Sequence, residues 1–126
     1  MVMGKHKGNS FENKIYKELR EILPDIKLTI GSGNSERDAD LISDKYIFEL
    51  KHYKTLSDKQ LNQFFNKVAG EGREHDKIPI LLFKENYKEI KAMLMMYNGD
   101  VGVPAIISYD NLTTIIGYEG ICEYGL

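Results

Sequence analysis

Apolar and polar positions along the chain predict alternating helices and strands. Large apolar residues recur at helical spacing after a candidate cap at Asn9 or Ser10, and the pattern ends before Pro24. The apolar positions of this predicted first helix are Phe11, Ile15, Leu19, Ile22 and Leu23. The polar residues that precede it, 1–8, are rich in Gly and Lys and are expected to form a flexible arm.

Three short apolar segments follow this helix. Residues 26–30 alternate apolar and polar side chains, which predicts a strand that ends at a Gly-Ser-Gly sequence over 31–33. Residues 40–42 and 46–51 are two further apolar segments, and only 43–45 connect them. Because so short a connection joins antiparallel strands, the two segments are predicted to form a β-hairpin.

A second helix and a buried strand are predicted next. Ser57 begins another helical pattern, which is expected to end around residues 70–72. Its apolar face consists of Leu61, Phe64, Phe65 and Val68. Residues 78–83 form a continuous apolar run typical of a buried strand. Since a helix separates this run from the hairpin, it is expected to pair in parallel with one hairpin strand.

The C-terminal third has less distinctive patterns. Residues 91–97 fit either a helix or a strand, and we favour a strand. An apolar run over 103–107 precedes residues 109–116, which fit a short helix. The complete order of elements predicts an α/β fold, in which a mixed central sheet is flanked by helices.

Length and composition suit one domain spanning 1–126. The chain has 126 residues, of which 42% are hydrophobic, so two separate cores do not fit. No apolar run approaches the roughly 20 residues of a membrane span, and the first residues lack the apolar stretch of a secretory signal. A cytoplasmic protein is therefore expected. Cys122 is the only cysteine, which excludes an internal disulfide framework and a cysteine-rich zinc site.

Charge is unevenly distributed, although the net charge is only −2. The first twenty residues carry five Lys or Arg against two Glu, whereas residues 92–126 contain four acidic residues and no Lys or Arg. A surface that binds nucleic-acid phosphates is thus expected within the first ninety residues. The apolar C-terminal third, which lacks basic residues, is a candidate surface for a homodimer.

The candidate chemistry lies in the predicted hairpin. Glu49 and Lys51 are two residues apart on one strand and so share a face, and Asp40 on the partner strand could approach Glu49. Two carboxylates beside a lysine suit Mg²⁺ or Mn²⁺, which prefer oxygen ligands. Lys51 could then orient a water molecule or help to deprotonate it, with a pKa depressed by the nearby cation. Exposed strands often carry such charges by chance, but the apolar neighbours Ile47, Phe48 and Leu50 favour a functional site.

These segments, in this order, resemble the PD-(D/E)xK nucleases and, within them, archaeal and phage Holliday-junction resolvases. The matching segments are Gly8-Asn9-Ser10-Phe11-Glu12, Gly31-Ser32-Gly33, Asp40-Leu41-Ile42 and Phe48-Glu49-Leu50-Lys51. The resemblance covers residues 8–85, and Ala39 stands where many members have proline. It implies a restriction-endonuclease-like fold and a Mg²⁺-dependent DNA endonuclease that acts on branched DNA as a homodimer.

The resemblance also implies a role for each matching residue. Glu12, Asp40 and Glu49 would be catalytic residues and metal ligands, and Lys51 would be the catalytic lysine. Glu12 has an alternative role, because it lies three residues after Asn9 and could complete a capping box. Asp38 competes with Asp40 for the position of the family's aspartate, and we prefer Asp40 because it leads directly into Leu41 and Ile42.

Several polar residues are candidate contacts to DNA phosphates, although each could also be an ordinary surface residue. They are Lys5, Lys7, Lys14, Ser32, Lys54, Lys59 and Gln63. Two other functions remain open at this level. One is a PD-(D/E)xK nuclease of repair or restriction type that cuts other DNA, and the other is a DNA-binding module without catalysis.

Overall fold

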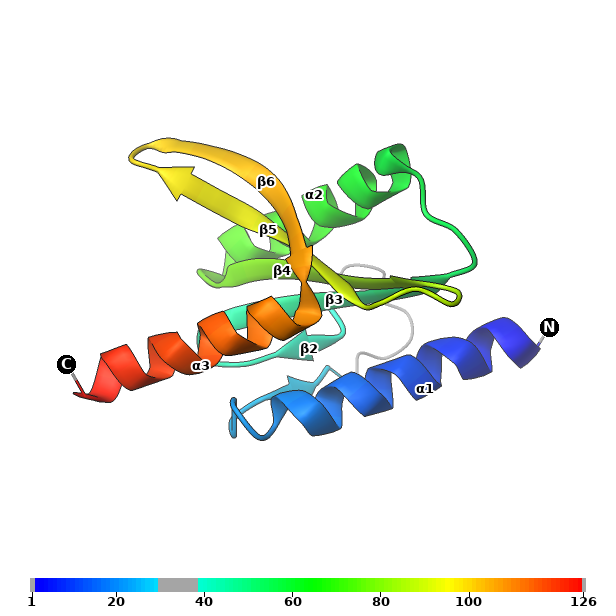
Figure 1. The fold of residues 1–126 in the computed structure, drawn as a ribbon, viewed down its shortest axis with the longest axis horizontal. Coiled ribbons are helices and arrows are strands. Elements are labelled where there is room, and N and C mark those ends of the chain that lie inside the picture. Colours follow the sequence, from blue (N-terminus) through cyan, green and yellow to red (C-terminus); the bar gives the residue numbers. More distant parts are fainter. Residues whose placement is uncertain (1, 30–38, 126) are drawn as a thin grey trace.

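The protein is built around a six-stranded mixed sheet (Figure 1). The structure, a computed structural model, describes residues 2–29 and 39–125, with side chains for 10–29 and 39–118. The strands lie side by side in chain order: β1 (Lys27–Leu28), β2 (Leu41–Ile42), β3 (Tyr46–Tyr53), β4 (Ile78–Glu85), β5 (Lys91–Asn98) and β6 (Val101–Ser108).

Strand pairing follows the lengths of the connections. β2 and β3 form the predicted antiparallel hairpin, and β4 pairs with β3 in parallel, as predicted, after the crossover through α2 (Asp58–His75). The remaining neighbours are antiparallel, and the preference for a strand over 91–97 is confirmed by β5. The predicted α/β fold with a mixed sheet is therefore confirmed.

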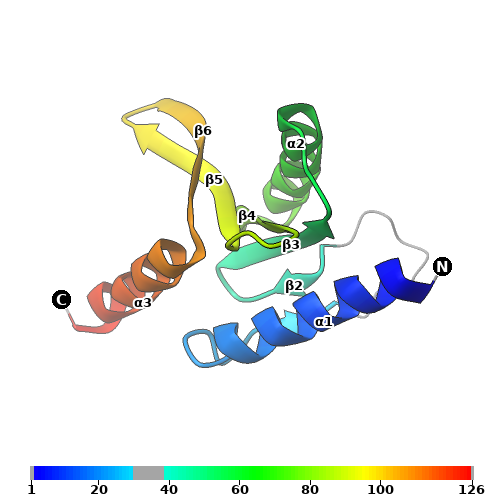
Figure 2. The same ribbon diagram turned by 45° about the vertical axis from the view of Figure 1, so that its right-hand side comes forward.

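Helices cover both faces of the sheet (Figure 2). α1 (Val2–Leu19) and α3 (Tyr109–Gly125) pack on one face, and α2 packs on the other. Alternation along β3 sends Phe48 and Leu50 into the core beneath α1 and α3, whereas Ile47 joins the core beneath α2. Glu49 lies two residues after Ile47 on β3, so its charged side chain points to the same face of the sheet, toward α2.

Both ends of α1 and the end of α2 differ from the sequence prediction: α1 stops at Leu19 rather than just before Pro24. α1 begins at Val2 rather than after Asn9 or Ser10, and so takes in residues expected to form an arm. Once the helix has formed around Phe11 and the apolar residues that follow it, its extension toward the N-terminus adds one hydrogen bond per residue without a second entropic cost of nucleation. α2 continues past the predicted end at residues 70–72 and stops at Asp76, which has a left-handed conformation.

Gly72 lies inside α2 for a packing reason. A Cβ atom at this position would lie 2.7 Å from the backbone oxygen of Lys77 and 3.2 Å from the Pro79 ring. The helix can thus pass close to the start of β4 only where a side chain is missing. The start of α2 matches the prediction, because Ser57 caps the helix and forms a reciprocal capping box with Gln60.

The C-terminal third forms a hairpin and a helix. β5 and β6 pair along their whole length, but β5 pairs with β4 only through residues 91–93, so the hairpin extends beyond the rest of the sheet (Figure 1). α3 is longer than the short helix expected within 109–116. Within residues 2–29 and 39–125, no helix is long and apolar enough to cross a membrane.

Candidate active site

The β2–β3 hairpin brings Asp40 next to the strand that carries Glu49. The backbone N–H of Asp40 donates to the Phe48 carbonyl at 2.9 Å, which continues the ladder one residue beyond the Leu41–Phe48 pair. The Asp40 carboxylate oxygen Oδ2 in turn accepts a hydrogen bond from the Leu50 N–H at 2.8 Å. The expected approach of Asp40 to Glu49 across the ladder is therefore present.

Glu49 is a charged residue in a buried position. Its side chain is only 4% exposed, and its Oε2 lies 3.1 Å from the Lys51 ammonium nitrogen. Its other oxygen, Oε1, is buried and has no hydrogen-bond partner among the described residues. Burial, reinforced by the charge of Asp40, raises the pKa of Glu49 to about 7.

Asp40 shares this environment. Burial raises the pKa of Asp40 above its ordinary value, although the Leu50 N–H and the charge of Lys51 oppose the shift. Both carboxyl groups are thus desolvated, and the charge of Asp40 disfavours the ionisation of Glu49, whereas a hydrogen bond from Glu49 lowers the pKa of Asp40. A cation held between them would offset the cost of ionising both.

Lys51 contacts both a carboxylate and an aromatic ring. Burial by itself would lower the pKa of Lys51, but the charge and hydrogen bond of Glu49, together with the charges of Tyr53 and Asp40, raise it overall. The pKa of Lys51 is therefore raised by its carboxylate partner, and the depressed value expected beside a bound cation stays a prediction. The ammonium also lies 4.7 Å from the centre of the Phe64 ring, in cation–π geometry.

Glu12, on α1, lies close enough to the site to interact electrostatically with Asp40 and Lys51. Burial raises its pKa, as does the charge of Asp40, while Lys51 lowers it. The capping-box alternative for Glu12 is wrong, because Asn9 lies inside α1 rather than at its N-terminus. Within the described parts of the chain, however, no three His, Cys, Asp or Glu side chains are close enough to hold a metal ion. Glu12 thus does not complete a three-ligand group with Asp40 and Glu49.

The predicted DNA contacts whose side chains are described are all exposed. Lys14 is exposed on α1, Lys54 follows β3, and Lys59 and Gln63 are exposed on α2. Ser32 and Asp38 lie outside the described residues, as do the side chains of Lys5 and Lys7.

Sequence reasoning missed Lys67 on α2. The positive charge of Lys67 lowers the pKa of both Asp40 and Glu49. Lys67 is therefore close enough to the site to interact with both carboxyl groups. Lys67 lies three residues after Phe64 and so shares its helix face, but the contact of Phe64 with Lys51 is visible only in the structure.

The donor set suits a hard divalent cation. Asp40 and Glu49 offer carboxylate oxygens, and Oε1 of Glu49 is already desolvated with no hydrogen-bond partner in residues 10–29 and 39–118. Mg²⁺ commonly takes one or two carboxylates from a protein and retains several water molecules, so a third protein carboxylate is not required. The two residues therefore fit such an ion.

Comparison with known proteins assigns the chain to a family. The family model described as "Phage putative PDDEXK endonuclease" matches residues 3–111, from α1 to the start of α3. The chain belongs to this PD-(D/E)xK endonuclease family. The resemblance of the sequence to PD-(D/E)xK nucleases is thereby confirmed, and nucleases of this kind generally use divalent metal ions. A search of the curated proteins found no match to the sequence.

A solved structure supports the assignment of the fold. The Holliday junction resolvase Hjc of the archaeal hyperthermophile Archaeoglobus fulgidus superimposes with a TM-score of 0.57. The match covers 86% of this chain and 96% of the resolvase, at 12% sequence identity. This likeness shows that the PD-(D/E)xK endonuclease described here has the restriction-endonuclease-like fold.

Proposed function

We propose that this nuclease hydrolyses backbone phosphodiesters of DNA with Mg²⁺ or Mn²⁺ held by Asp40 and Glu49. The observation that carries the proposal is the buried Glu49 carboxyl beside the half-buried Asp40; one Glu49 oxygen near Lys51 has no hydrogen-bond partner in the described part of the chain. Such an arrangement costs stability in the protein alone, because it desolvates acidic groups and places them together. A bound cation would offset that cost.

Each residue of the site has a distinct task in this proposal. When bound, the cation would activate a water molecule and offset the charge that develops on the phosphate. Asp40 is fixed by the Leu50 N–H, so its carboxylate is held rigidly for coordination. Lys51 keeps its proton while paired with Glu49, and can donate a hydrogen bond to the phosphate or to the attacking water. Glu12 stays a predicted ligand, acting directly or through water.

We further propose branched DNA as the substrate, in the manner of a Holliday-junction resolvase. The fold shared with Hjc, which is described as a Holliday junction resolvase, supports this substrate class. Junction resolution requires two matched cuts, and two sites related by a dimer axis could supply them.

The exposed apolar residues of the C-terminal third support a homodimer. Their side chains are from 40% to 70% exposed, and they belong to β5, β6 and α3: Met96, Tyr97, Val101, Val103, Ile106, Ile115 and Tyr118. Large apolar side chains that stay exposed on neighbouring elements are typical of an interaction surface. Sedimentation of the wild type should give the mass of a dimer, and the double substitution Val103→Glu with Ile106→Glu should shift it to a monomer.

A cleavage assay tests the nuclease function. End-labelled four-way junction, linear duplex and single-stranded DNA of matched sequence are incubated with the protein in Mg²⁺, Mn²⁺ or EDTA. We expect cleavage that requires a divalent ion and is fastest on the junction. Glu49→Gln should abolish cleavage but retain DNA binding, whereas Glu74→Gln, on the exposed surface of α2, should cut like the wild type.

The other outcomes discriminate between the alternatives. Cleavage of duplex in preference to the junction would indicate a nuclease of repair or restriction type. Metal-independent binding without cleavage of any substrate would indicate a DNA-binding module. Cleavage by Glu49→Gln at the wild-type rate would overturn the assignment of the site.

A further inference from the structure

Tyr53 and Phe64 form an aromatic pair directly beside the candidate site. Glu49, Lys51 and Tyr53 occupy alternate positions of β3 and share the face that α2 covers. The rings of Tyr53 and Phe64 have centroids 5.7 Å apart and are tilted by 39°. The same Phe64 ring lies beneath the Lys51 ammonium, so one aromatic side chain links Tyr53 to the charged residues of the site.

Tyr53 combines exposure with a rigid backbone position. Its side chain is 39% exposed, although it ends a strand whose preceding apolar residues are buried. Its carbonyl accepts a hydrogen bond from the Asn86 N–H at 3.1 Å, which ties the end of β3 to the turn after β4. The ring is therefore held at the surface by a fixed strand end rather than by a loop.

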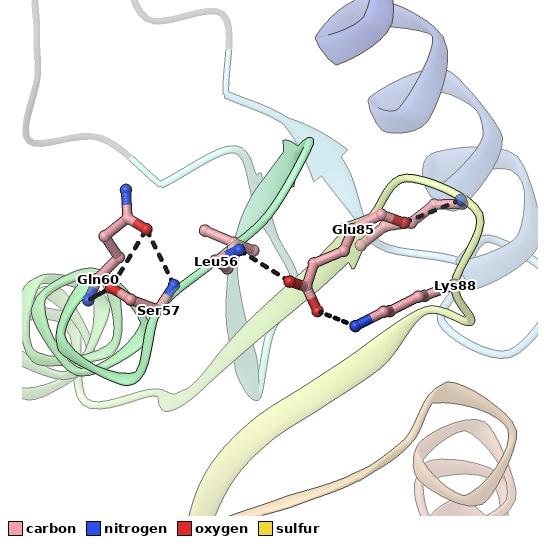
Figure 3. Close-up of polar contacts among 6 residues, drawn as sticks. Leu56, Ser57, Gln60, Glu85 and Lys88 are labelled. Atoms are coloured by element: carbon pink, nitrogen blue, oxygen red, sulfur yellow. Dashed lines mark hydrogen bonds and ion pairs between the residues drawn. The ribbon is translucent and has the colours of Figure 1, made fainter.

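The connection from β3 to α2 is fixed as well (Figure 3). The Leu56 N–H donates to Glu85 Oε2 at 2.8 Å, and Lys88 lies 3.5 Å from the other oxygen of that carboxylate. Ser57 and Gln60 then cap the first turn of α2, as Figure 3 shows. These contacts set the distance between the helix that carries Phe64 and the strand that carries Tyr53.

The spacing along β3 suits a nucleic-acid strand. At about 3.3 Å per residue, the Tyr53 backbone lies about 7 Å from that of Lys51 and about 13 Å from that of Glu49. The second distance corresponds to a few nucleotides, given an axial rise of about 3.4 Å per nucleotide in duplex DNA. Lys54, which is exposed, follows Tyr53 directly in the sequence and offers a further cation near this end of β3.

We propose that Tyr53, supported by Phe64, stacks on an unpaired base a few nucleotides from the phosphate that is cut. The inference rests on the proposed nuclease function and specifies the substrate feature that the site recognises. A tyrosine ring can stack on any base, whereas the faces of bases within an intact duplex are already covered by their neighbours. The nuclease should therefore prefer DNA in which the strand next to the cut is opened.

The substitution of Tyr53 by leucine tests this preference in a cleavage assay. The substrates are one duplex and the same sequence with three unpaired nucleotides next to the cut. Tyr53→Leu keeps an apolar contact with Phe64, and we expect a loss of about ten-fold or more in kcat/KM on the opened substrate, mainly through KM. The loss on the duplex should be smaller. Tyr53→Phe keeps the ring and should retain the wild-type preference.

A binding assay reports stacking independently of cleavage. The protein carrying Glu49→Gln is titrated with DNA that holds 2-aminopurine at each unpaired position in turn. Quenching of the fluorescence is expected at one position, should disappear with Tyr53→Leu, and should persist with Tyr53→Phe. Tyr87→Leu is the matched control, because Tyr87 is fully exposed in the turn between β4 and β5 and should change neither assay.

The two assays separate failure of this inference from failure of the proposed function. If the wild type cleaves DNA with a divalent ion but Tyr53→Leu shows unchanged preference and quenching, the inference is overturned and the nuclease function stands. If no DNA is cleaved under any condition, the nuclease function fails. The quenching assay still decides in that case whether Tyr53 stacks on a base.

Discussion

The backbone N–H of Leu50 donates a hydrogen bond to the Asp40 carboxylate across the β2–β3 hairpin, at 2.8 Å. Leu50 lies between Glu49 and Lys51, so the strand that carries these two charged side chains also orients the opposing carboxylate through its backbone. The hydrogen bond does not depend on any side chain of β3. Substitutions at Glu49 or Lys51 should therefore change the chemistry of the site without releasing Asp40.

The raised pKa of Glu49 predicts how stability depends on pH. Burial and the charge of Asp40 raise this pKa to about 7, from 4.5 for an ordinary glutamate. Between these values the folded protein holds a proton that the unfolded chain has released, so stability should fall as pH rises from about 4.5 to 7 and level off above. Urea denaturation in EDTA at pH 5, 6, 7 and 8 measures this slope.

Glu49→Gln provides the comparison, because glutamine cannot ionise. The decrease in stability between pH 5 and 7 should be smaller in this variant than in the wild type. Mg²⁺ should stabilise the wild type more at pH 8 than at pH 5, since a cation binds the ionised carboxyl groups. Identical pH profiles for the two proteins would show that Glu49 does not titrate in this range.

Two glycines of α2 predict opposite effects of the same substitution. In Gly72→Ala the new methyl group would lie 2.7 Å from the Lys77 oxygen, so α2 or the start of β4 must move, at a cost of about 1–3 kcal/mol. At Gly70 the nearest atom to a new methyl group is the end of the Arg73 side chain, at 3.8 Å. Gly70→Ala should therefore stabilise the helix by about 0.5–1 kcal/mol. Denaturant melts of both variants check the difference, and equal effects would contradict the packing at Gly72.

Local patterns in the sequence were sufficient for the elements that surround the site. A three-residue connection implies an antiparallel hairpin, alternation places Glu49 and Lys51 on one face, and Ser57 before a helical apolar pattern marks the start of α2. Each of these inferences depends on neighbours within a few residues. The α/β fold class and the family followed from combining them.

The remaining features depend on packing between distant segments. The proximity of Lys67 and Phe64 to the site follows from how α2 crosses β3, which no local pattern specifies. The end of α2 was misplaced because glycine usually marks a helix terminus, whereas Gly72 is there to let the helix approach β4. The spacing that suggested a capping box at Glu12 likewise ignored the continuation of α1 to Val2.

DNA binding should depend strongly on salt, although the net charge is −2. Contacts between lysines and phosphates release counterions, so log K should fall with log salt with a slope that reflects several contacts. Lys67→Gln should reduce the magnitude of the slope by about one, because Lys67 faces the site. Lys27→Gln is the control, since Lys27 is exposed in β1 on the edge strand. Fluorescence anisotropy of the Glu49→Gln protein measures the slope, and a value near zero would argue against phosphate contacts.

The last prediction distinguishes Asp40 from Asp38 as the aspartate of the family motif. Asp40 is held on both sides, since its N–H donates to the Phe48 carbonyl and its carboxylate accepts from the Leu50 N–H. A ligand of Mg²⁺ needs such rigidity, because this ion tolerates little departure from octahedral geometry. Asp40→Asn should therefore lose nearly all metal-dependent cleavage, while Asp38→Asn, at a position outside the described residues, should lose much less. Circular dichroism should show both variants folded, so that cleavage rates report on the site. Greater damage from Asp38→Asn would transfer the ligand role to that residue and leave Asp40 as a carboxylate that only stabilises the hairpin.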